Sequence, residues 1–124
     1  MKPFKPDERR LHPRVDSTLP LKVAANGFDF STTTQNISCL GAYCHIDKYV
    51  PPFTRVFIKL ALPVANKSGG DLPVECNGVI VRTEDASDGG FNIAIFFNRI
   101  KDDQRKKITQ YINRFLPQET AHLA

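Results

Sequence analysis

Two short polar segments of this 124-residue chain carry the side chains best suited to chemistry, and the first lies near the N-terminus. Residues 9–14 have the sequence RRLHPR and contain Arg9, Arg10 and Arg14. Arginine presents a planar fork of donors that grips phosphate groups, and it also pairs with or stacks on nucleobases. Arg10 and Arg14 are four residues apart and can close around a compact anionic ligand. A solvated, charged tail explains the same residues equally well, so this segment alone does not indicate a function.

The second segment, residues 36–41, has the sequence NISCLG and ends a run with the alternation of a β-strand. The two-residue period of a strand places Asn36 and Ser38 on one face and turns Ile37 toward the other. An amide beside a hydroxyl can hydrogen-bond the polar edge of a base or a ribose. Gly41 allows a ligand or another backbone to come close, or permits a positive φ. The alternative is a polar strand end with a local Asn or Ser turn before the glycine.

The remaining reactive residues do not form a catalytic or metal-binding pattern. The sequence has no HExxH, Walker or GxSxG pattern, and its histidines are scattered. The three cysteines are odd in number and form no CxxC pair, so buried or half-buried thiols are expected rather than metal ligands. The residues concerned are His12, His45 and His122, and Cys39, Cys44 and Cys76. We therefore predict a protein that is not an enzyme and that needs neither metal nor cofactor.

The cysteines and the N-terminus also bear on the cellular compartment. Cysteines without an evident disulfide pattern are typical of a reducing environment. The first residues lack the apolar stretch of a signal peptide, and no apolar run approaches the roughly 18 residues of a membrane span. We therefore expect a cytoplasmic protein without a membrane span.

Charge is distributed unevenly along the chain, whose formal net charge is +4. Residues 1–14 carry a net charge of +3 and residues 99–116 a net charge of +4, whereas residues 15–98 carry −2. Both ends are therefore basic and the middle is mildly acidic. This distribution favours an anionic partner held by one end and disfavours a broad nucleic-acid face across the core.

Six runs of alternating or β-rich sequence must position the two polar segments. We predict strands at residues 18–25, 28–37, 42–46, 56–62, 72–83 and 91–97, with turn signals between them. The period then changes, and five apolar residues recur at helical spacing as one stripe: Ile108, Tyr111, Ile112, Phe115 and Leu116. A helix is therefore predicted from a cap at Asp102 or Asp103 to Leu116, where Pro117 ends it. Six short strands and a terminal helix indicate a small antiparallel barrel. The predicted organisation is a flexible basic arm at residues 1–17, a barrel with its helix at 18–116 and a loose tail at 117–124.

Together, the two polar segments resemble the signature of the PilZ domain family, RxxxR followed by (D/N)xSxxG. Here these are residues 10–14 and 36–41, and the resemblance extends over about residues 8–116. It implies a six-stranded antiparallel β-barrel of the split-barrel type with a C-terminal α-helix. It also implies a ligand, the bacterial second messenger cyclic di-GMP, bound at the barrel surface.

The resemblance further implies a role for each matching residue. Arg10 and Arg14 would contact the phosphates and guanine faces, and Asn36 and Ser38 would hydrogen-bond a guanine and nearby polar atoms. Gly41 would keep the strand end open. A basic residue just before RxxxR goes with an intercalated pair of ligand molecules in this family, and Arg9 occupies that position.

The expected function is a stand-alone cyclic di-GMP receptor and adaptor. Phosphates of the ligand would neutralise the basic arm, which would fold onto the barrel and create a surface for a downstream protein. Two alternatives stay open. One is a small basic barrel that binds single-stranded nucleic acid, although the Phe residues fall largely at core-like positions such as Phe91 and Phe97. The other is a ligand-free protein-interaction module of the same fold.

Overall fold

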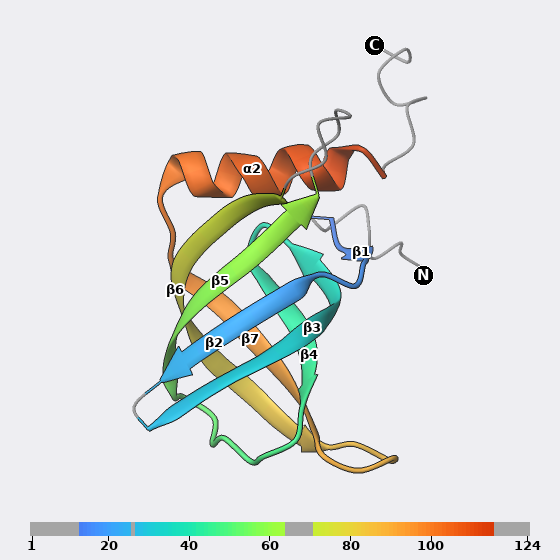
Figure 1. Cartoon of the computed structure of the whole chain (residues 1–124), viewed down its shortest axis with the longest axis vertical. Coiled ribbons are helices and arrows are strands. Elements are labelled where there is room, and N and C mark those ends of the chain that lie inside the picture. Colours follow the sequence, from blue (N-terminus) through green and yellow to red (C-terminus); the bar gives the residue numbers. More distant parts are fainter. Residues whose placement is uncertain (1–12, 26, 64–70, 116–124) are drawn as a thin grey trace, which may run out of the picture.

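The computed structural model describes residues 13–25, 27–63 and 71–115, which form seven strands and one helix (Figure 1). The strands are β1 (Val15–Asp16), β2 (Pro20–Ala25), β3 (Phe28–Ser38), β4 (Gly41–Ile46), β5 (Arg55–Pro63), β6 (Asp71–Asp85) and β7 (Phe91–Arg99). The helix is α2 (Asp102–Asn113). Among the described residues, no helix has the length and apolar character needed to cross a membrane.

Six of the strands close into an antiparallel barrel. Their order is β3-β2-β5-β6-β7-β4, and β4 pairs back to β3, so the ring has no open edge. The six-stranded antiparallel barrel predicted from the sequence is therefore confirmed. The extra strand, β1, pairs with β3 beyond the point where β2 ends, with Val15 opposite Ile37 and Asp16 opposite Asn36. The sequence analysis assigned these residues to the flexible arm, residues 1–17, but in the structure they form a strand of the sheet.

Alternating side chains build the core, as the period-two pattern predicted. Along β5 the residues facing inward are buried and their neighbours are exposed, which is the pattern of a strand with one face in the core. The same alternation on the other strands fills the barrel with aliphatic side chains, including Leu21, Ile37, Ile58, Ile80 and Ile93, each at most 1% exposed. These side chains therefore fill the interior of the barrel.

Helix α2 lies across one end of the barrel (Figure 1). Its buried side chains are Ile108, Tyr111 and Ile112, three of the five apolar positions predicted to form its stripe. An amphipathic helix laid over a barrel mouth removes these side chains and the core beneath them from water. At the opposite end, Val50 in the β4–β5 loop is 1% exposed and extends the core.

The helix boundaries differ from the predicted ones. Its N-cap is Lys101, which has extended backbone angles and makes no side-chain capping bond, so the predicted cap at Asp102 or Asp103 is wrong. The chain turns one residue earlier, and both aspartates occupy the first helical turn, where their charge favours the helix dipole. The helix ends at Asn113 rather than near Pro117, and Phe115 is 55% exposed. Leu116, Pro117 and the predicted tail lie outside the described residues, as do Asn26 and the whole β5–β6 connection, residues 64–70.

All three cysteines are buried free thiols, as the sequence predicted, and two of them have a strongly shifted pKa. Burial raises the pKa of Cys44 from 9.0 to about 12. Burial also raises the pKa of Cys76 to about 12, although the charge of Arg105 opposes the shift. A thiol that stays protonated is a poor nucleophile, so these two positions are inert in the native protein.

This burial predicts an alkaline limit to stability. Because the thiol pKa is higher in the folded protein, the contribution of Cys44 and Cys76 is fully present below pH 9 and is lost as pH rises toward 12. Between pH 9 and pH 12 the two thiols ionise in the unfolded chain but stay protonated in the native protein, and this ionisation stabilises the unfolded chain. Urea unfolding at pH 8 and pH 10 should show a clear fall in stability, and a Cys44→Val/Cys76→Val variant should show a smaller one. An equal fall in both proteins would mean that other groups cause it.

Candidate ligand-binding site

The fold brings the two polar segments into direct contact. A guanidinium nitrogen of Arg14, Nη1, donates a hydrogen bond to Oδ1 of Asn36 at 2.8 Å, across 22 residues of sequence. Both side chains lie on the outside of the barrel, where Arg14 is exposed and Asn36 half-buried. The carboxamide oxygen keeps a second lone pair, and its NH₂ group can still donate. Arg9 and Arg10, with the rest of residues 1–12, lie outside the described residues.

A local irregularity in β3 sets the position of Asn36. Thr34 pairs with Cys44, but Asn36 pairs with Tyr43, so β3 has one more residue than β4 at this point. Such a β-bulge bends the strand and re-aims the side chains that follow it. Thr34 and Ile37 both face the interior as a result, and Asn36 faces outward beside the arm.

Asn36 has two flanking side chains that the sequence reasoning missed. Asp16 lies directly opposite it on β1, and Tyr43 lies opposite it on β4. The half-buried Tyr43 points its hydroxyl toward Glu84 at 3.4 Å, so its ring lies along the outer surface. No motif marks either residue. Only the pairing of three strands places a carboxylate, an amide and an aromatic ring in one row.

Ser38 has a local structural role in this structure. Its side chain is 1% exposed, and its Oγ accepts a hydrogen bond from the backbone amide of Leu40 at 3.1 Å. The backbone carbonyl of Leu40 accepts a hydrogen bond from the amide of Phe97 at 2.8 Å, which connects the turn to β7. The Ser-turn alternative raised from the sequence is therefore present. Direct contact of Ser38 with a ligand stays a prediction.

Gly41 allows two strands to approach each other. A Cβ placed on this residue would collide with the backbone carbonyl oxygen of Ile95 and would lie 3.4 Å from the Cα of Phe96. Of the three possibilities that the sequence left open, the close neighbour is therefore another backbone, that of β7. The glycine lets β4 begin immediately after the Ser38 turn and holds the end of β3 in place.

The base of the arm is anchored to the barrel and to the helix. The hydroxyl of Thr34 donates to the carbonyl of Ser17 at 2.5 Å and accepts from the amide of Leu19 at 2.9 Å. The side chain of Ser17 makes a short hydrogen bond to the hydroxyl of Tyr111 on α2. Arg14 therefore lies three residues from a fixed point, which limits how far its guanidinium can move from Asn36.

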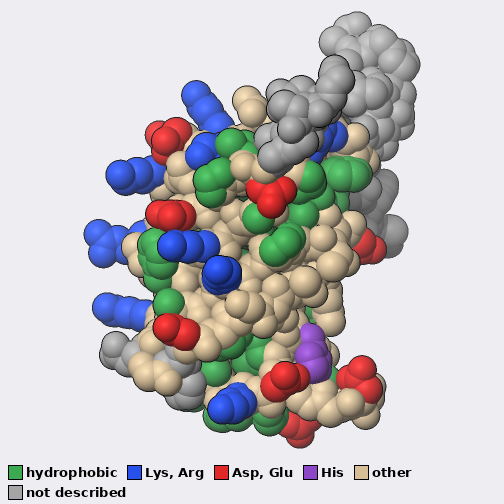
Figure 2. Space-filling view, viewed as in Figure 1, with side chains coloured by type: hydrophobic (Ala, Val, Ile, Leu, Met, Phe, Trp, Pro, Cys, Tyr) green, Lys and Arg blue, Asp and Glu red, His purple; other side chains and the backbone are tan. Residues whose placement is uncertain are grey.

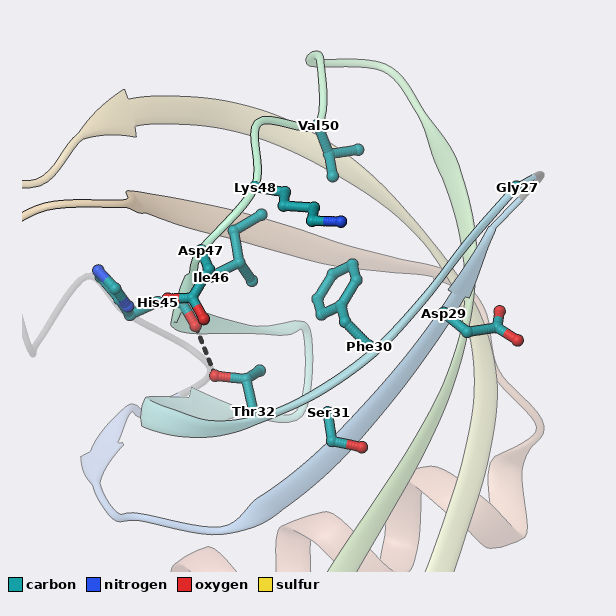
Figure 3. A pocket seen from close by; sticks show the side chains of 10 residues that line it. All are labelled: Gly27, Asp29, Phe30, Ser31, Thr32, His45, Ile46, Asp47, Lys48 and Val50. Atoms are coloured by element: carbon teal, nitrogen blue, oxygen red, sulfur yellow. Dashed lines mark hydrogen bonds between the residues drawn. The ribbon is translucent and has the colours of Figure 1, made fainter.

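One hollow in the surface lies away from this site. It has a volume of about 310 Å³ and lies between β3 and the segment after β4, where the side chain of Phe30 points toward Val50 and Lys48 (Figure 3). The hydroxyl of Thr32 donates to the carbonyl of His45 at 2.5 Å in its wall. None of the residues singled out for ligand binding lines it.

His45 lies within the described residues, and it has a structural role. The ring nitrogen Nε2 of His45 is 2.7 Å from the carbonyl oxygen of Gly89 in the β6–β7 turn. In the part of the chain that the structure describes, no group of three or more potential ligands is arranged to hold a metal. His12 and His122 lie outside it.

Comparison with protein families identifies the domain. A model of the PilZ domain matches residues 8–114, which is most of the chain and includes both polar segments. The chain belongs to the PilZ domain family. PilZ domains are known as cyclic di-GMP-binding modules rather than catalysts. A search of curated protein sequences found no match.

Solved structures of PilZ proteins share this fold. The Bacillus subtilis inhibitor of motility, MotI/DgrA, is 17% identical with a TM-score of 0.75, over 86% of this chain and 50% of that one. This chain thus spans half the length of that protein. The PilZ domain of CeSA from a cellulose-synthesizing bacterium is 14% identical with a TM-score of 0.55, over 82% and 97% of the two chains. The PilZ domain of YcgR from Escherichia coli with c-di-GMP is 10% identical with a TM-score of 0.55, over 94% and 99%.

Proposed function

We propose that this PilZ domain is a cyclic di-GMP receptor of the bacterial cytoplasm that signals to a partner protein as an adaptor. The observation that carries the proposal is the 2.8 Å hydrogen bond between Arg14 and Asn36. It joins the last arginine of RxxxR to the first residue of NxSxxG on the barrel surface. A guanidinium and a carboxamide held together offer the donors that phosphate and guanine edges accept.

The flanking residues extend this chemistry. The ring of Tyr43 offers a surface on which a guanine can stack, and such stacking is worth about 1–3 kcal/mol per base. The carboxylate of Asp16, opposite Asn36, can accept from the N–H groups of guanine. Ser38 and Gly41 support the strand end from within. A hydrogen bond from Ser38 to the ligand would require its buried hydroxyl to turn outward.

The arm supplies the remaining contacts. Because Ser17 is fixed to the barrel and to α2 and β1 pairs with β3, Arg14 is already held beside Asn36 before a ligand binds. Arg10 would add a second guanidinium to that of Arg14, and Arg9 would favour an intercalated pair of ligand molecules. The ordering cost is offset by charge-assisted hydrogen bonds to the phosphates. The ordered arm, the ligand and the barrel would together present a new surface to a downstream protein.

Calorimetric titration of cyclic di-GMP into the full chain tests the proposal. We expect saturable binding with a stoichiometry of two ligands per domain if Arg9 has the role proposed for it, and of one otherwise. GTP and a single-stranded oligonucleotide serve as controls and should give no comparable heat. A folded sample that gives no heat with cyclic di-GMP would overturn the receptor role. Binding of the oligonucleotide in its place would favour a nucleic-acid barrel.

A further inference from the structure

The barrel has a second surface with a distinctive composition on the wall made by β5 and β6 and their neighbour β2. In the ring of strands, the β5–β6 pair lies opposite the β3–β4 pair that carries Asn36 and Tyr43. We call this surface the basic wall. Its exposed cations and aromatic residue are Lys22 on β2, Arg55, Phe57 and Lys59 on β5, Arg99 at the end of β7 and Lys101 at the N-cap of α2. Strand β6 adds the exposed side chains of Glu75 and Asn77. Figure 2 shows Lys and Arg side chains projecting along this side of the molecule.

The described part of the fold compensates the cations of the basic wall only in part, because Glu75 on β6 lies directly opposite Lys59. No described residue forms an ion pair or a side-chain hydrogen bond with any of its lysines or arginines. Lys22 and Lys59 lie directly opposite each other on β2 and β5. Like charges at such a pair destabilise a sheet, so the fold gains nothing from this arrangement. An external anionic group would relieve the repulsion.

Three neighbouring hollows lie in the surface of the basic wall. Phe57, which is 37% exposed, borders two of them, with volumes of about 360 and 440 Å³. The third, of about 290 Å³, is lined by Arg55 and Arg99 together with the amide of Asn77. In the sheet, Asn77 stands directly opposite both Phe57 and Arg99. An aromatic ring and two guanidiniums beside shallow hollows form the kind of centre that dominates protein interfaces.

The acidic residues decide which class of partner fits. Asp29, Glu75 and Asp103 line the same hollows and alternate with the cations. Interspersed carboxylates repel a continuous phosphate backbone, whereas they can pair with individual basic groups on a protein that is acidic overall. A mixed surface with a net positive charge therefore favours a protein partner over a nucleic acid.

The structure also explains why the basic wall could not be predicted from the distribution of charge along the sequence. Residues 15–98 are mildly acidic as a stretch, but many of their acids gather elsewhere, at the end of the barrel that holds the β6–β7 turn. Glu84 and Asp85 end β6, Asp88 lies in the turn, and Asp47 follows Ile46, which pairs with Phe91 at the start of β7. Figure 2 shows acidic side chains at this end of the molecule. The sequence also placed the Phe residues largely in the core, yet Phe53 and Phe57 are 78% and 37% exposed.

We propose that the basic wall is a docking surface for a protein partner that presents an acidic surface with an apolar side chain at its centre. Phe57 and the pair Arg55 and Arg99 form its centre, and Lys22 and Lys59 extend the attraction. Docking here requires neither the arm nor cyclic di-GMP. The domain can thus hold a partner on one wall while its opposite wall binds the ligand proposed above.

The test uses a defined probe, a short fluorescein-labelled peptide in which glutamates surround two phenylalanines. Its anisotropy is followed on titration with the full chain, and amide shifts in NMR spectra locate the contact. The Arg55→Glu/Arg99→Glu variant should weaken binding roughly tenfold or more, since it reverses two charges at the centre. A matched control, Lys48→Glu/Arg82→Glu, changes net charge equally at exposed positions outside the basic wall and should weaken it far less. Circular dichroism checks that both variants are folded.

Each result bears on the proposal directly. Support requires saturable, salt-sensitive binding, perturbed amides on β5 and β6, loss in the first variant alone and indifference to added cyclic di-GMP. Equal weakening in both variants would show a general charge effect, and tighter binding of oligothymidine than of the peptide would show a nucleic-acid face. Absence of binding would likewise overturn the proposal. Cyclic di-GMP titrations of the same folded variants stay normal if the two walls are separate, so failure of the receptor role remains distinguishable.

Discussion

Replacing Arg14 with alanine is expected to weaken cyclic di-GMP binding by roughly 30-fold or more. Hydrogen bonds from a charged donor contribute about 1.5–3 kcal/mol each, and about 2 kcal/mol corresponds to this factor. The substitution also removes the 2.8 Å partner of Asn36, so the amide loses its fixed orientation. Because Arg14 is exposed, the free energy of unfolding should change by no more than about 0.5 kcal/mol. Calorimetry and urea unfolding on the same protein separate the two effects.

Two matched variants show whether the affinity that depends on Arg14 comes from the shape of its guanidinium or from its charge. Arg14→Lys keeps the charge but loses the planar fork, and it should recover only part of the affinity. Asn36→Asp keeps an oxygen facing Arg14 and should retain most of it. If Arg14→Ala binds cyclic di-GMP like the wild type, the ligand does not use the Arg14–Asn36 pair and the site assigned here is wrong.

Replacing Gly41 with alanine is expected to destabilise the fold by about 3 kcal/mol, the largest loss we predict for any single methyl group. Overpacking of a tight contact commonly costs 1–3 kcal/mol when side chains can shift. Here the added Cβ meets the backbone carbonyl of Ile95, which the β4–β7 ladder holds in place. Relief would require β4 and β7 to move apart and would break the adjacent hydrogen bonds. Urea unfolding measures the loss.

Gly89→Ala provides the comparison, because this glycine has positive φ, +104°, but nothing within 4 Å of an added Cβ. It isolates backbone strain, which costs about 1–2 kcal/mol, from steric collision. Gly41→Ala should be clearly the less stable of the two. If it is as stable as the wild type but fails to bind cyclic di-GMP, Gly41 serves the ligand directly and the steric account is incorrect.

The amino-acid sequence was sufficient for the architecture, and it marked the two polar segments that we propose as the ligand site. Period-two alternation depends only on which face of a strand is buried, so six strands and their core positions could be predicted from it. The amphipathic stripe of α2 was likewise visible. The ends of the helix could not be predicted in the same way. No capping side chain marks its N-cap at Lys101, and packing against the barrel sets where it begins and where it ends at Asn113.

The contacts that carry the proposed functions were decided by tertiary structure. Arg14 and Asn36 meet because β1 pairs with β3, and the orientation of Asn36 depends on a bulge that no local signal marks. The basic wall joins Lys22 and Arg55, from the mildly acidic stretch of residues 15–98, to Arg99 at the start of the basic C-terminal segment. Whether a residue is buried, and which charges surround it, depends on its position in space. Closure of the barrel places these cations on one wall and Asp47, Glu84, Asp85 and Asp88 at the end that holds the β6–β7 turn.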